Sequence, residues 1–283
     1  IRDANKSVQK LDIYDYERPI GIQIFGDKIE SMREAAAIAE NARPELVDIN
    51  YGCPVKKVAC KGAGAGILQD IPKMERMTAE IVKQVTTMPV TVKTRLGWDE
   101  NSIKILEVAE RLQGVGIQAL SIHGRTRSQM YKGEADWNHI AEVKNHQNIH
   151  IPIFGNGDID SPEKALEYKN KYGVDGIMIG RAAIGYPWIF REIKHYLKTG
   201  EKLAPPTLEE RIAVCKKHLQ KSLEWKGDVQ GVLEMRRHYT NYFKGFAHFK
   251  PHRTRLVSTD APNELFDILD EISEVFKGEQ PIT

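Results

Sequence analysis

Short apolar runs alternate with amphipathic segments through the first two thirds of the chain, and this regular alternation constrains the fold most strongly. The runs cover residues 20–25, 46–50, 90–95, 119–123, 151–156 and 176–180, and segments of helical periodicity lie between them. Strand, helix and strand at such spacing are typical of a parallel α/β fold. Pro19, Pro89 and Pro152 stand at strand entrances, where a missing N–H costs little.

Polar side chains gather where these runs end, at Gln23, Lys93, Arg95, His123, Arg125, Asn156 and Asp158. In a (β/α)₈ barrel, the carboxyl ends of the strands and the loops that follow them build the active site. A doubly wound sheet would also place ligands there. However, no G-x-G-x-x-G motif follows an early strand, so the sequence favours a TIM-type (β/α)₈ barrel.

The chain divides into two predicted domains. Six strands can be counted where a barrel needs eight, and the chain opens at Ile1 without a methionine, so we expect the first two strands to precede residue 1. Near residues 202–206 the pattern changes, and Thr207 followed by acidic residues resembles a helix N-cap. We expect an N-terminally incomplete barrel over residues 1–200 and a small helical domain over residues 201–283.

Composition excludes several classes of protein. The 41 basic residues nearly balance the 39 acidic ones, so any nucleic-acid surface must be local. The three cysteines, Cys53, Cys60 and Cys215, are too few for a disulfide framework and fit a reducing cytoplasm. No apolar run approaches the ~20 residues of a membrane span. We therefore expect a soluble, cytoplasmic protein with no membrane partner.

Cys53 stands directly after the second predicted strand, between a glycine that allows a sharp turn and Pro54. A thiol there can act as an acid or a nucleophile, with its reactivity set by nearby charge. A lone cysteine is also often a small buried apolar residue. Position alone does not choose between these roles, whereas Cys60 and Cys215 lack such a setting and are expected to be structural.

The segment Asn50-Tyr-Gly-Cys-Pro, followed by Gly-Ala-Gly-Ala-Gly from residue 62, resembles the signature of the tRNA-dihydrouridine synthases. Further blocks match the same family in order: Gln23-Ile-Phe-Gly, Val92-Lys-Thr-Arg-Leu-Gly-Trp, His123-Gly-Arg-Thr-Arg, Gly155-Asn-Gly-Asp and Gly180-Arg-Ala. The similarity is closest to the bacterial B-type branch. It implies an FMN enzyme that uses NADPH, or NADH, to reduce uridines in tRNA, with Cys53 as proton donor.

Several of these residues suit a flavin site. Lys93 could stabilise the anionic reduced ring, although a solvated lysine at a strand end is common. Gln23 lies inside an apolar run, where a buried amide needs partners; the flavin edge or the barrel core could supply them. The resemblance implies that His123 contacts the flavin. No second ligand lies at metal-binding spacing from His123, so we expect no metal.

The predicted phosphate site follows the last two strands. Barrels often bind phosphate there through glycine backbone and a helix N-terminus. We assign it to Asn156, Gly157, Asp158, Gly180 and Arg181, although each segment alone could be an ordinary glycine turn.

Two groups of residues are candidates for RNA contact. Near the barrel mouth, Asn50 and Arg95 could orient the target base, and Arg125 and Arg127 could reach the RNA or be surface charges. Residues 211–255 hold eleven basic and three acidic side chains, a local net charge of +8, interleaved with aromatic residues. We expect most of the aromatic residues to form a helical core and Arg236, Arg237, Lys244 and Arg253 to face tRNA.

The sequence thus predicts a monomeric flavin enzyme acting on tRNA. Two other functions remain open at this point. One is an FMN barrel oxidoreductase that acts on a small pyrimidine, and the other is a non-catalytic RNA-binding protein.

Overall fold

The computed structural model describes residues 11–279 and 281, and the chain forms two compact units. The first unit comprises Ile1–Ile159 and Glu167–Met178, and the second comprises Asp160–Leu166 and Ile179–Thr283. The units divide before the helix that spans residues 189–199. They therefore do not coincide with the expected domain limit at residue 200, which stays a prediction.

The first unit is built on one parallel sheet whose strands follow one another in sequence order, with helices between them. The strands are β1 (Gly21–Ile24), β2 (Leu46–Tyr51), β3 (Val90–Arg95), β4 (Ala119–His123), β5 (Ile153–Asn156) and β6 (Gly176–Met178). Sequential parallel strands with helical crossovers are the arrangement of a TIM-type barrel, so the predicted fold class is confirmed. The two further strands expected before residue 1 lie outside the described residues.

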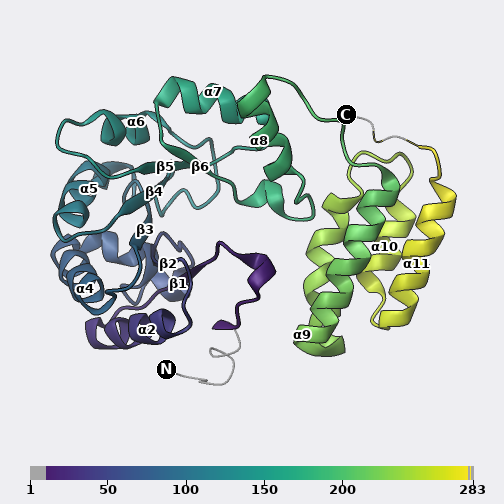
Figure 1. Cartoon of the computed structure of the whole chain (residues 1–283), viewed down its shortest axis with the longest axis horizontal. Coiled ribbons are helices and arrows are strands. Elements are labelled where there is room, and N and C mark those ends of the chain that lie inside the picture. The colour runs from purple at the N-terminus through teal and green to yellow at the C-terminus, as the bar shows by residue number, and fades with distance from the viewer. Residues whose placement is uncertain (1–10, 280, 282–283) are drawn as a thin grey trace. The chain divides into compact units, whose positions relative to one another are not determined.

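The crossover helices are α2 (Ile29–Asn41), α4 (Ile71–Gln84), α5 (Ile105–Gly114), α6 (Asn138–Asn145) and α7 (Pro162–Tyr172). The Asp70 side chain starts α4 by accepting a hydrogen bond from the Lys73 N–H. Figure 1 shows α2, α4, α5 and α6 along the outer side of the row of strands. Short helical turns complete the connections: α3 (Lys56–Ala59) and the 3-10 helices η2 (Asp15–Glu17), η3 (Gly64–Gln69) and η4 (Glu100–Ser102).

The two faces of the sheet differ in character because side chains alternate along a strand. One face is apolar and packs on the helices; Val47, Ile49 and Leu120 on it are completely buried. Gly155 belongs to this face, and a Cβ there would lie 2.0 Å from the Trp137 ring. The opposite face is polar, and its side chains are the ones that the sequence placed in the candidate site.

The second unit is helical. It contains η5 (Arg181–Ala183), α8 (Ile189–Thr199), α9 (Leu208–Tyr242), α10 (Lys250–Ser258) and α11 (Pro262–Val275). Thr207 and Glu210 form the capping box that the sequence predicted at the start of α9. Gly227, with φ of 74°, breaks α9 into two helical halves, which sequence periodicity did not predict. No helix among the described residues has the length and apolar character of a membrane span.

Candidate active site on the polar face of the sheet

Cys53 lies on a loop that is held at several points. The N–H groups of Gly52 and Cys53 both donate to Asn50 Oδ1 at 2.9 Å. Arg95 Nε donates to the Gly52 carbonyl at 2.8 Å, and the Ala65 N–H donates to the Cys53 carbonyl at 3.0 Å. Cys53 is partly exposed, whereas Cys60 is exposed and Cys215 is buried. The loop therefore fixes the backbone of a thiol that remains partly accessible.

A chain of hydrogen bonds links this loop to the strands beside it. Asn50 Nδ2 donates to Gln23 Oε1 and Gln23 Nε2 donates to Asp48 Oδ2, both at 2.7 Å. Thr91 Oγ1 donates to the other carboxylate oxygen of Asp48 at 2.6 Å. Burial raises the pKa of Asp48, while the hydrogen bonds from Thr91 and Gln23 oppose that rise. The side-chain amides of Asn50 and Gln23 consequently have defined orientations.

These contacts change two expectations. Gln23 is exposed, and its amide is satisfied by Asp48 and Asn50, so the argument that a buried Gln23 needs flavin partners is wrong. The amide oxygen of Asn50 accepts the hydrogen bonds that hold the Cys53 loop, and one amide N–H of Asn50 donates to Gln23. The second amide N–H of Asn50 is what it can offer to a base. Their assignments to flavin and base binding stay predictions.

Lys93 lies on β3 in register with Asn50 on β2 and Ser121 on β4. Burial, together with the neighbouring Arg95, lowers the pKa of Lys93 to about 8, although Asp48 opposes the change. The ammonium is therefore still mainly protonated at neutral pH. A poorly solvated cation of this kind suits a ligand that carries or develops negative charge.

Arg95 and Arg125 are buried, with 2% of each exposed. Besides the Gly52 carbonyl, Arg95 binds the carbonyls of Thr126 and Met130 at 2.9 and 2.8 Å. The expectation that Arg125 is free to reach RNA is wrong, because its guanidinium is enclosed by protein acceptors. Arg95 likewise holds loops together instead of presenting its charge to a base. The sequence alone gives no sign that these two guanidinium groups are buried, because most of their acceptors are loop carbonyls.

His123 ends β4, in register with Arg95 on β3 and Asn156 on β5, and is 5% exposed. Burial and the cations Arg95, Lys93 and Arg125 lower its pKa to about 3. The imidazole is therefore neutral throughout the physiological range. It can donate or accept a hydrogen bond without bringing a charge to the polar face.

The segment after β5 is shaped by close approaches. Asn156 Nδ2 donates to the Met178 carbonyl at 2.7 Å, and the Gly157 carbonyl accepts from Trp137 Nε1 at 3.0 Å. Gly157 has φ of 130°, and a Cβ there would lie 2.5 Å from Ala135 Cβ, so only glycine fits. The assignment of Gly157 to a phosphate site stays a prediction.

Asp158, with φ of 57°, accepts from Arg125 Nη2 at 2.7 Å and from the Ala135 N–H at 2.8 Å. Its carboxylate is thus engaged in the protein. Gly180 and Arg181 are exposed and open η5 in the second unit. Their grouping with Asn156 and Gly157 at one phosphate stays a prediction.

The candidate RNA residues fall into exposed and engaged groups. Lys244, Arg253 and Arg237 are exposed, and Arg237 Nε is 3.1 Å from His238 Nε2. Arg236 forms an ion pair with Asp260 at 2.5 Å. Arg127 is half-buried, with its guanidinium 4.5 Å from the centre of the Trp98 ring. All five residues therefore remain candidates for RNA contact, and they differ in how accessible they are to solvent.

The helical unit confirms the expected interior of aromatic residues. The members of its buried core include Tyr239, Tyr242, Phe243, Phe246 and Phe249, none more than 8% exposed. Acidic residues beyond position 255 pair with several of the basic ones, in Arg236–Asp260, Lys216–Asp270 and Arg255–Glu271. The local excess of positive charge is consequently smaller in the folded protein than in the sequence window.

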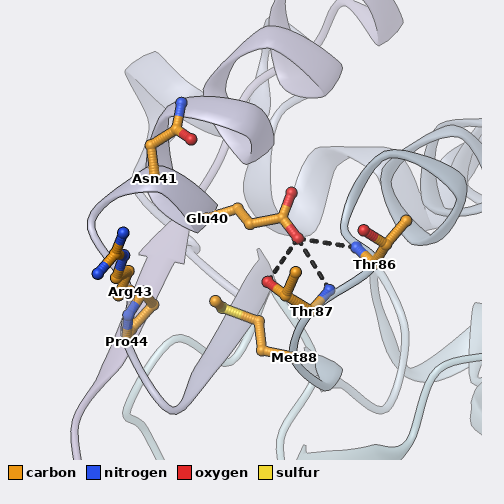
Figure 2. Close-up of a pocket in the computed structure, with 7 residues that line it drawn as sticks. All are labelled: Glu40, Asn41, Arg43, Pro44, Thr86, Thr87 and Met88. Carbon is orange, nitrogen blue, oxygen red and sulfur yellow. Dashed lines mark hydrogen bonds between the residues drawn. The ribbon is translucent and has the colours of Figure 1, made fainter.

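A separate polar pocket lies at the amino ends of β2 and β3 and is lined by Glu40, Asn41, Arg43, Pro44, Thr86, Thr87 and Met88. Figure 2 shows Glu40 reaching across to the 86–87 turn. Its Oε1 accepts from both N–H groups of that turn and from Thr87 Oγ1, at 2.7–2.9 Å, and these bonds lower its pKa. The pocket is at the opposite strand ends from Cys53, where barrels place stabilising contacts.

Comparisons with known proteins point to one family. The profile of the family "Dihydrouridine synthase (Dus)" matches residues 1–277. "Probable tRNA-dihydrouridine synthase 1" of Synechocystis sp. is 42% identical over 263 residues, covering 93% of this chain and 73% of that protein.

Two further relatives carry the name "tRNA-dihydrouridine synthase B". The protein of Pseudomonas putida is 46% identical over 223 residues, covering 78% of this chain and 64% of its own length. The protein of Pseudomonas aeruginosa is 43% identical over 266 residues, covering 92% and 78%. With a profile match over nearly its whole length and relatives at these identities, the chain belongs to the dihydrouridine synthase family.

Proposed function

We propose that this protein reduces uridines in tRNA to 5,6-dihydrouridine, with Cys53 as the proton donor. The observation that carries the proposal is the Cys53 loop. Hydrogen bonds from Arg95 and Ala65, and to Asn50, hold it at the carboxyl end of β2. The polar face that begins there presents a buried cation and a neutral imidazole, Lys93 and His123.

The residues on this face fit FMN. A flavin ring has a polar edge and becomes negatively charged on reduction, which suits Lys93 and a neutral His123. We assign Gln23, Asn156, Gly157 and Asp158 to the same cofactor. Bound FMN supplies the hydride that goes to uracil C6, and NADPH or NADH is the proposed reductant.

Cys53 completes the reduction of the C5=C6 double bond. As a C–H bond forms at C6, the π electrons of the double bond take the thiol proton at C5. The thiolate that remains is reprotonated from solvent. Arg95, by holding the Gly52 carbonyl, keeps the thiol's backbone in place through this step.

The substrate is large, and its target base must leave the stack to reach a site at strand ends. Lys244, Arg253 and Arg237 are exposed cations that suit a phosphate backbone. We propose that they contact tRNA, together with Arg236 and Arg127, and that the protein works as a cytoplasmic monomer without a metal.

The test compares Cys53→Ala with Cys60→Ala, a change of an exposed cysteine outside the site. Purified protein is incubated with FMN, NADPH and unmodified tRNA, and dihydrouridine is measured by mass spectrometry. Loss of a general acid slows reactions about 10²- to 10⁴-fold, so we expect a loss of that size for Cys53→Ala alone. Both variants should bind FMN as the wild type does. Normal turnover by Cys53→Ala would show that the thiol is not the proton donor.

A further inference from the structure

The side chain of Arg125 determines which nitrogen of His123 carries a proton. Arg125 Nη1 lies 3.2 Å from His123 Nε2. A guanidinium has only N–H donors and no acceptor, so Nε2 must accept this hydrogen bond. A neutral imidazole that accepts at Nε2 carries its proton at Nδ1. No hydrogen bond among the described residues uses Nδ1, which leaves this N–H for a ligand.

Arg125 cannot easily turn away from His123. Its Nε donates to the Lys132 carbonyl at 3.2 Å, and Nη2 donates to the Gly133 carbonyl at 2.6 Å. Nη2 also forms the ion pair with Asp158 at 2.7 Å. These contacts fix the plane of a guanidinium that is almost wholly buried, and with it the position of Nη1.

Burial and the three cations that face His123 oppose its protonation at both nitrogens. Lys93 and Arg95 approach from β3, and Arg125 approaches from the loop after β4. Asp158 is the one carboxylate that favours protonation, and it already pairs with Arg125. The ring of Tyr131, whose centre is 6.2 Å from that of His123, adds no charge.

We propose that Arg125 is a positioning residue that holds His123 as a neutral Nδ1–H donor for a hydrogen-bond acceptor of the bound ligand. The acceptor is an oxygen or ring nitrogen of a planar heteroaromatic group. That it belongs to the flavin rests on the proposed function. Arg125 thus acts through His123, without touching tRNA or the reacting atoms.

The test reads the tautomer directly in protein without flavin. Long-range ¹H–¹⁵N spectra of ¹⁵N-labelled protein are recorded between pH 5 and 8, and His123→Gln identifies the signal. We expect the Nδ1–H pattern, unchanged across this range. An Nε2–H pattern, or a titration of His123 within it, would overturn the proposal.

Variants separate positioning from simple stability. Arg125→Met should give a mixture of the two neutral tautomers, because the donor that holds Nε2 as an acceptor is removed. Arg76→Met, a change of an exposed arginine on α4, should leave the spectrum as in the wild type. An unchanged His123 spectrum in Arg125→Met would also overturn the proposal. If that variant does not fold, the wild-type spectrum still decides.

Flavin binding is measured separately, by fluorescence titration of FMN. We expect Arg125→Met to weaken FMN binding at least tenfold, while Cys53→Ala leaves it unchanged. FMN binding by Arg125→Met as tight as in the wild type would overturn the role in ligand binding. An Nδ1–H spectrum in a protein that binds no FMN would defeat the proposed function and leave the effect of Arg125 on His123 standing.

Discussion

Removing the buried charge of Lys93 should make the folded protein more stable at neutral pH. The perturbation is Lys93→Met, which keeps most of the side-chain volume and removes the ammonium. Among the described residues, no carboxylate lies within ion-pair distance of Lys93. Asp48, the nearby acid that interacts with it, keeps its hydrogen bonds from Thr91 and Gln23 in the variant. Because the charge of Lys93 destabilises the folded protein, we expect this residue to serve ligand binding.

The size of the effect follows from the pKa of Lys93, which burial and Arg95 lower from 10.5 to about 8. Each tenfold change in an ionisation constant is worth about 1.4 kcal/mol, so the charge costs at most about 3.5 kcal/mol at pH 7. Lys93 is not wholly buried, and solvent screens part of this. We expect Lys93→Met to raise the free energy of unfolding by about 2 kcal/mol.

The effect has a defined dependence on pH. Because the pKa of Lys93 is lower in the folded protein than in the unfolded chain, the unfolded chain binds more protons between about pH 8 and 10.5. Stability from this group therefore rises with pH in that window. The cost is fully present below pH 8, and most of the advantage of Lys93→Met should be gone by about pH 10.

The assay is urea unfolding of the wild type and Lys93→Met at pH 7 and pH 10, followed by circular dichroism. Taking the difference between the two proteins cancels the other titrating groups. Lys83→Met, on the exposed side of α4, is the control and should change stability by less than about 0.5 kcal/mol. A variant that is less stable at pH 7, or a difference that is equal at both pH values, would refute the reasoning.

Two further predictions concern the Cys53 loop and the RNA surface. Asn50→Ala leaves two loop N–H groups without their acceptor, so we expect a loss of about 1–2 kcal/mol in urea unfolding and at least tenfold slower dihydrouridine formation. Asn50→Asp keeps the acceptor and should lose less stability; equal losses would contradict the assignment. Lys244→Ala combined with Arg253→Ala should weaken tRNA binding and lower the slope of log K against log salt by about 2. Lys216→Ala, at a lysine paired with Asp270, is the control, and equal slopes would exclude those contacts.

The strands were largely predictable because apolar runs mark buried strands wherever helices cover one face. The expected run at 90–95 coincides with β3, the run at 119–123 coincides with β4, and β2 extends one residue beyond its expected end. The short edge elements were less well bounded. β6 ends at Met178 instead of residue 180, where the chain turns toward η5.

The sequence predicted which residues lie at the candidate site better than it predicted what each of them does there. Residues at the carboxyl ends of parallel strands must meet at one edge, so the sequence identified Lys93, His123 and Cys53 from position. It could not show that Arg95 and Arg125 are buried. Most of their partners are carbonyl groups of the 126–133 loop, and the conformation of that loop cannot be read from its side-chain pattern.

The break in α9 was missed for a different reason. The sequence predicted a helical domain here without dividing it into helices, so it did not mark a break at Gly227, although a glycine in mid-helix is a known weak point. The Ser222 hydroxyl donates to the Gly231 carbonyl across the break, a contact that only the folded chain reveals. Sequence periodicity describes each half and carries no information about the angle between them.

The central claim is that the thiol of Cys53, at the carboxyl end of β2, makes this chain a uridine reductase of tRNA. The most direct measurement is mass spectrometry of tRNA from a strain that lacks the gene, complemented with the complete reading frame or with the same frame carrying Cys53→Ala. The account predicts that dihydrouridine missing from the deletion strain returns with the wild-type frame and does not return with Cys53→Ala. Equal dihydrouridine with both frames, or none lost in the deletion strain, would contradict it.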